Sequence, residues 1–104
     1  MTTPVNEARG EASVRVGGVE LILRPTFAAL CAAETEIGGL FDIVERAVAA
    51  KLHLHELAAL FWHCCVERPK ELTREAFGEA MVVTGLAKLT PALKVLLGQI
   101  LQGL

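Results

Sequence analysis

The sequence predicts a mainly α-helical domain opened by an N-terminal β-hairpin, which makes it α+β by a strict count of elements. Apolar residues recur at helical spacing through most of residues 26–103. Apolar residues alternate along residues 12–23 on both sides of a Gly-Gly pair, with polar residues between them except at Ile22. A chain of 104 residues has room for one domain with its own core, so we expect residues 12–104 to form a single compact bundle of four to five short helices behind the hairpin.

The hairpin is expected over residues 12–24. Gly17-Gly18 suits a type I′ turn, because both central residues of that turn need a positive φ, which glycine adopts without steric cost. The turn fixes a register that places Val16 opposite Val19, Val14 opposite Leu21 and Ala12 opposite Leu23. The apolar side chains then share one face, which must pack on the helices because two strands alone are marginal in water.

Five helices are expected after the hairpin, at about residues 26–37, 40–51, 54–67, 73–84 and 90–103. Thr26 and Thr73 are placed as N-caps, and Thr90 followed by Pro91 suits the start of the last helix. Residues 51–53 contain neither glycine nor proline, so a merger of the second and third helices, and a count of four, stays open. The polar residues 1–11 show no periodicity and are expected to be a disordered tail.

Helical spacing also predicts which side chains face the core. The first helix is expected to bury Phe27, Leu30 and Cys31. The third is expected to bury Leu54, Leu57, Ala58, Phe61, Cys64 and Cys65.

Composition argues against several classes of function. The net charge is −2 and the ten Lys and Arg residues are scattered, so no nucleic-acid-binding surface is expected. Charged residues or histidines interrupt every apolar stretch, and the N-terminus lacks the apolar run of a signal peptide, so we expect neither a membrane span nor export. The expected location is the cytoplasm. The odd number of cysteines suits reduced, buried thiols.

No residue pattern indicates catalysis, a cofactor or a metal. His55-Glu56 lacks the second histidine of the zinc-protease motif, and Cys64-Cys65 lacks the two-residue spacer of a thiolate zinc site. No glycine-rich stretch matches a phosphate-binding loop. We therefore expect no catalytic, cofactor-binding or metal-binding residues and a protein that is not an enzyme.

Candidate partner-binding residues lie on two helices. Trp62 falls outside the expected inner stripe of its helix, so it either packs against the hairpin or anchors a partner. Leu97, Leu101 and Leu104 continue the apolar stripe of the last helix to the chain end, where it can fill a core groove or enter a groove of another chain.

The junction between the hairpin and the first helix resembles a known family. The residues that carry the resemblance are Leu23, Arg24, Pro25, Thr26, Phe27, Leu30 and Glu34. This signature, followed by amphipathic helices, is similar to the small tail proteins of gene transfer agents and related prophages. The similarity covers nearly the whole chain from Ala12.

The resemblance implies a role in building a phage-like tail. Members of the family are described either as tail assembly chaperones, which coat the tape-measure protein until tube subunits assemble round it, or as tail tube components. A tube subunit needs many strands and this chain supplies two, which favours a chaperone that binds the tape-measure protein or other tail proteins. The alternatives are a tube-associated component of the virion and a generic dimeric helical interaction module, and a homo-oligomer stays open.

Overall fold

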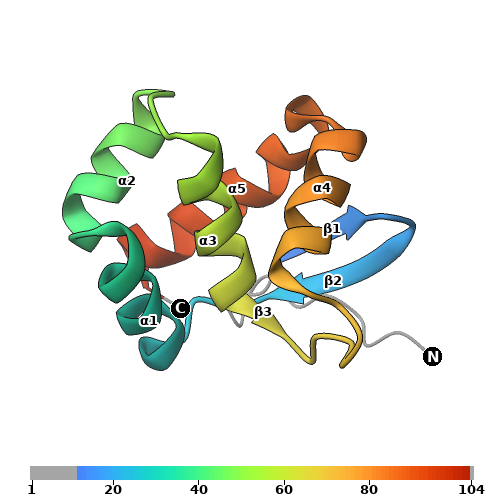
Figure 1. The fold of residues 1–104 in the computed structure, drawn as a ribbon. Coiled ribbons are helices and arrows are strands. Elements are labelled where there is room, and N and C mark those ends of the chain that lie inside the picture. The colour runs from blue at the N-terminus through green and yellow to red at the C-terminus, as the bar shows by residue number, and fades with distance from the viewer. Residues whose placement is uncertain (1–11, 104) are drawn as a thin grey trace.

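Five helices follow a β-hairpin, and a third, very short strand lies between the third and fourth helices (Figure 1). The structure is a computed structural model that describes residues 12–103; the expected tail over residues 1–11, and Leu104, lie outside the described residues. The elements are β1 (Ala12–Val16), β2 (Val19–Leu23), α1 (Phe27–Ile37), α2 (Leu40–Val48), α3 (Leu54–Cys64), β3 (Cys65–Val66), α4 (Arg74–Thr84) and α5 (Leu86–Gln102). The predicted fold class is confirmed.

The hairpin has the predicted register, with Val16 opposite Val19, Val14 opposite Leu21 and Ala12 opposite Leu23. Gly17 and Gly18 both have positive φ, 60° and 79°, as a type I′ turn requires. One face of the hairpin is buried against α4 and α5, and Val19, beside the turn, is the apolar side chain that stays half exposed at 48%. The hairpin therefore closes one side of the helical core.

The core beneath the hairpin draws on all three strands and on four of the helices. Its largest fully buried side chains include Leu23, Phe61, Phe77, Met81, Leu89 and Leu96. Full burial of each such side chain contributes roughly 1.5–3 kcal/mol, so this layer dominates the stability of the fold.

A two-residue strand, β3, replaces the last turn of the helix expected over residues 54–67. It pairs antiparallel with β2, Ile22 opposite Val66 and Leu23 opposite Cys65. The backbone N–H of Arg24 donates to the carbonyl of Cys64 at 2.8 Å, and Glu67 has a φ of +55°, which no helix accommodates. The helix is shorter than expected because the chain leaves it to pair with the hairpin.

The apolar face of α3 also differs from the expected stripe. Leu54 is 46% exposed, whereas Leu60 is fully buried and the carboxylate of Glu56 is almost fully buried. The helix carries apolar residues on most of its circumference, so spacing alone did not determine its orientation.

The first helix begins at the expected cap, and the second ends earlier than expected. The hydroxyl of Thr26 accepts a hydrogen bond from the backbone N–H of Ala29 at 3.1 Å, which confirms the predicted cap. Phe27 is 85% exposed, contrary to expectation, because Ala29 and Ala33 form the buried face of α1. The second helix ends at Val48, before residues 49–53 lead into α3, so the two helices do not merge.

The start of the last helix differs from the prediction. The hydroxyl of Thr73 caps α4 as expected, by accepting from the backbone N–H of Ala76 at 3.0 Å. Thr90 does not cap α5: this helix begins at Leu86, and Pro91 lies inside it. Gly85, with a φ of 97°, ends α4 and starts α5 in one residue.

The lengths and directions of the helices bear on the membrane question. Among residues 12–103, no single helix is both long and apolar enough to cross a bilayer. The pair α4 and α5 reaches that length and composition together, but the two helices meet at 112°.

Candidate partner-binding groove

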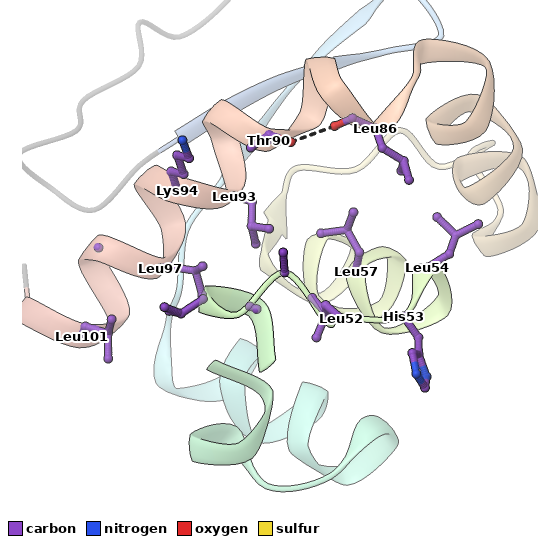
Figure 2. A pocket seen from close by; sticks show the side chains of 14 residues that line it. Leu52, His53, Leu54, Leu57, Leu86, Thr90, Leu93, Lys94, Leu97 and Leu101 are labelled. Carbon is purple, nitrogen blue, oxygen red and sulfur yellow. Dashed lines mark hydrogen bonds between the residues drawn. The ribbon is translucent and has the colours of Figure 1, made fainter. Parts of the chain in front are cut away.

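An open apolar groove of about 620 Å³ lies between α5 and the segment that runs from the end of α2 into α3 (Figure 2). We call it the α5 groove. It is lined by Ala47, Val48, Ala50, Leu52, His53, Leu54, Leu57, Leu86, Thr90, Leu93, Lys94, Leu97, Gly98 and Leu101.

One wall of the groove is a single face of α5. Seven lining residues between Leu86 and Leu101 recur at helical spacing, which places them along one side of the helix. At 1.5 Å per residue this wall is about 22 Å long, the length of four helical turns. Leu97 is buried at the base, whereas Leu101 is 59% exposed at one end and Leu86 52% exposed at the other.

The opposite wall is formed by the end of α2, the loop after it and the first turn of α3. Leu52, Leu54 and Leu57 lie across the groove from the leucines of α5 (Figure 2). Val48, at the end of α2, is 67% exposed. Apolar side chains therefore continue from the base of the groove to its rims. A small ligand bound at the centre would leave the apolar rims exposed to water.

A partly buried ion pair holds this second wall in place. The guanidinium of Arg46 on α2 donates to both carboxylate oxygens of Glu56 on α3, each at 2.5 Å. Glu56 also accepts a hydrogen bond from the backbone N–H of His53 at 2.9 Å. The Arg46 guanidinium lowers the pKa of Glu56 to about 2, against the opposing effect of burial. The wall is thus anchored by a carboxylate that stays ionised at neutral pH.

The groove offers an occupant few polar partners. The hydroxyl of Thr90 donates to the carbonyl of Leu86 at 3.0 Å and is therefore already satisfied (Figure 2). Lys94 and His53 are the charged or titratable lining residues, and both are exposed. This chemistry suits the apolar face of an amphipathic helix.

The structure separates the predicted partner-binding residues. Leu97 and Leu101 both line the α5 groove. Trp62 does not: it is half buried against Phe77 of α4, with ring centroids 5.6 Å apart, and the guanidinium of Arg68 lies 4.4 Å from its ring centroid. Leu104 lies outside the described residues. Trp62 thus packs against a ring of α4 and under the guanidinium of a loop arginine, at the edge of the core.

Sequence reasoning missed the second wall of the groove. Val48, Leu52 and Leu54 meet α5 only through tertiary packing, so no local pattern pairs them with it. On α5 itself, Leu86 was missed because the helix was expected to begin at Thr90. Tracing the apolar stripe of the last helix back as far as Gly85 would have included Leu86.

A second polar cluster ties three helices together away from the groove. Glu36 at the end of α1 accepts hydrogen bonds from the guanidinium of Arg74 on α4 and pairs with His63 Nε2 on α3 at 2.8 Å. Arg74, and then His63, lower the pKa of Glu36 to about 2. Pairing of this kind positions the three helices relative to one another.

One possible metal-binding cluster and the two adjacent cysteines each contain groups that are paired or buried. Ligand atoms of His53, His55 and Glu56 lie within 4.8 Å of one another, but both oxygens of Glu56 accept from Arg46. Burial raises the pKa of the Cys64 thiol to about 12 and also raises that of Cys65. Neither thiol is therefore a reactive thiolate at neutral pH.

Most of the signature residues have structural roles. Leu23 is fully buried, Thr26 caps α1, and Leu30 packs against the core. Glu34 Oε2 accepts a hydrogen bond from the backbone N–H of Leu40 at 2.8 Å, at the start of α2. Phe27, by contrast, is 85% exposed to solvent.

The comparisons with known proteins agree with this signature. A family model described as "Phage tail tube protein, GTA-gp10" matches residues 9–103. No curated protein and no solved structure was found to match the chain. The family is a phage tail family, and membership implies association with other tail proteins. The chain belongs to the GTA-gp10 family of phage tail tube proteins.

Proposed function

We propose that this protein is a non-enzymatic tail assembly chaperone that binds a helical segment of the tape-measure protein, or of another tail protein, in the α5 groove. The observation that carries the proposal is the groove itself: a four-turn apolar surface, open along its length, in a member of a phage tail family. Assembly of this kind takes place in the cytoplasm of the host cell.

The physical need for such a partner is clear. A tape-measure protein is long and helical, and its apolar stripes promote aggregation until tube subunits surround it. A groove that covers one stripe over about 22 Å keeps that segment in solution. The groove contributes few hydrogen bonds, so its contact with the tape-measure protein depends on apolar burial. The growing tube can therefore displace this chain from the tape-measure protein.

The small sheet supports a chaperone over a tube subunit. Closed tubes built from β-structure need several long strands in each subunit. Within residues 12–103 the sheet has three strands, of which β3 has only two residues. A structural component of the particle is the alternative that the family description favours.

Co-expression with a tape-measure protein from the same genome tests the proposal. We expect the tape-measure protein to be more soluble with this chain than without it, and the two to co-purify. Val48→Asp and Leu101→Asp place charges on the exposed rims of the groove and should abolish co-purification while leaving the fold intact. The matched control is Phe41→Asp, at a side chain that is 90% exposed and does not line the groove.

Two results would contradict the proposal. One is a tape-measure protein that is equally soluble alone and does not co-purify with this chain. The other is recovery of this chain in finished particles in a fixed ratio to tube subunits, which would establish a structural component instead.

A further inference from the structure

The two segments that form the walls of the α5 groove differ in charge from the rest of the protein. Residues 46–57 and 86–103 together contain four Lys or Arg and a single acidic residue, Glu56, which is paired with Arg46. The remaining residues contain six Lys or Arg and eleven Asp or Glu. Arg46 is paired with Glu56 and Asp42, whereas Lys94, which lines the groove, and Lys51, between the lining residues Ala50 and Leu52, are exposed. The groove is therefore apolar with a cationic border in a chain whose net charge is negative.

The outer face of α4 has the opposite character. Its exposed residues are Glu75, Ala76, Glu79, Val82 and Val83, which lie at spacings that place them on one side of the helix. Val82 is 57% exposed and Val83 84% exposed, an unusual concentration of β-branched apolar surface for a solvated helix. We call these five residues the α4 face.

The α4 face lies next to the α5 groove. A hollow of about 320 Å³ between α3 and α4 is lined by Glu75, Glu79 and Val82 and shares Leu54 with the groove. Leu86 at the other rim follows α4 after one residue. An apolar, cationic surface and an apolar, anionic surface are thus neighbours on one side of the molecule.

We propose that the free protein forms a symmetric dimer in which the α4 face of each copy occupies the α5 groove of the other. A two-fold axis near Leu54 brings each surface opposite its complement, as an isologous interface requires. Glu75 and Glu79 then lie beside the lysines of the partner's groove, and the two valines cover its leucines. A helix of eleven residues, about 16 Å long, fits within the groove of about 22 Å.

The dimer gives the groove a cover before a tail protein arrives. It goes beyond the proposed function, in which a tail helix takes the place of the α4 face. An isolated groove would leave Val48, Leu86 and Leu101 in water, and reciprocal docking buries these side chains together with both exposed valines.

Complementary charge reversals test the dimer. Sedimentation velocity over a dilution series should show wild-type protein at twice the mass of one chain. Glu75→Lys with Glu79→Lys makes both surfaces cationic, and Lys51→Glu with Lys94→Glu makes both anionic. Each double variant alone should dimerise at least about tenfold more weakly, because like charges then face each other. An equimolar mixture of the two should recover wild-type affinity, since both interfaces of the mixed dimer are complementary.

The controls separate charge from folding. Glu67→Lys with Glu71→Lys changes charge equally on exposed residues outside both surfaces and should leave dimerisation unchanged. Circular dichroism should show native helix content in every variant. A monomeric wild-type protein, double variants that dimerise like wild type, or a mixture that does not recover would each overturn the proposal.

The outcome is independent of the test of the chaperone role. If the tape-measure protein co-purifies with a chain that is monomeric when free, the dimer proposal is rejected and the chaperone proposal stands. If the two charge-reversed variants dimerise with each other but the protein does not bind the tape-measure protein, the chaperone proposal is rejected and the dimer proposal stands.

Discussion

The carboxylate of Glu34 accepts a hydrogen bond from the backbone N–H of Leu40 at 2.8 Å and so links the end of α1 to the first residue of α2. The donor is one of the N–H groups that α2 cannot satisfy internally. A negative charge at this end of a helix is also favoured by the helix dipole. Because α2 carries Ala47 and Val48 into the groove wall, a signature residue on α1 helps to position the groove.

Glu34→Ala should destabilise the protein by about 1 kcal/mol, the usual effect of losing a side-chain cap. Thermal denaturation followed by circular dichroism measures the change. Glu34→Gln, which keeps an acceptor oxygen, should lose less stability than Glu34→Ala. The exposed Glu45 of α2 is the matched control, and an equal loss in Glu45→Ala would show that the cap is not the cause.

Acid should destabilise the protein through Glu36 and Glu56. Both carboxylates have folded-state pKa values of about 2, below the ordinary value of 4.5, because they are paired with Arg74 and Arg46 respectively. Their contribution to the free energy of unfolding is therefore complete above about pH 4.5 and is lost as the pH falls toward 2. Melting temperatures measured across this range should decrease steadily.

Glu56→Gln should reduce stability at neutral pH and flatten part of this acid dependence. Glu71→Gln changes an exposed carboxylate before α4 and serves as the control. An acid profile for Glu56→Gln that keeps the full wild-type slope would mean that this pair does not contribute to it.

The hairpin face provides a direct test of packing. Val16→Asp should cost at least about 3 kcal/mol or unfold the domain, because it buries a charge that has no partner. Val19→Asp, directly opposite on the half-exposed strand position, should cost much less. Urea denaturation of the two variants makes the comparison, and equal losses would mean that the face is not packed as described.

Thiol labelling tests the burial of the adjacent cysteines. In native protein a thiol-specific reagent should modify at most Cys31, which is half buried, while the raised pKa values of Cys64 and Cys65 keep them protonated. In denaturant all three should react. Cys31→Ser should remove the native reaction, and rapid labelling of a second native thiol would contradict the assigned burial.

Local signals predicted most of the elements. The register followed from Gly17-Gly18 because a two-residue turn leaves one pairing of the strands, and the caps at Thr26 and Thr73 followed from side chains that bond to nearby backbone. Thr90 and Pro91 misled for the same local reason: they fit a helix start, but Gly85 allows an earlier one.

Long-range contacts account for what the sequence did not reveal. Burial of Glu56 depends on Arg46, ten positions earlier and on another helix, so a polar residue appeared to belong on the outer face of α3. Of the groove, only Leu97 and Leu101 were predicted as partner-binding residues, because an amphipathic stripe identifies one wall and says nothing of what faces it.

The two-residue strand β3 also sets an order of events in folding. It joins Ile22 to Val66, which are 44 positions apart, and the entropy of closing so long a loop is recovered only after the intervening helices have docked. The hairpin and the individual helices rely on near neighbours and can form early. We therefore expect the β2–β3 pairing to be absent from the folding transition state, so that substitutions at Val66 accelerate unfolding and leave the refolding rate nearly unchanged.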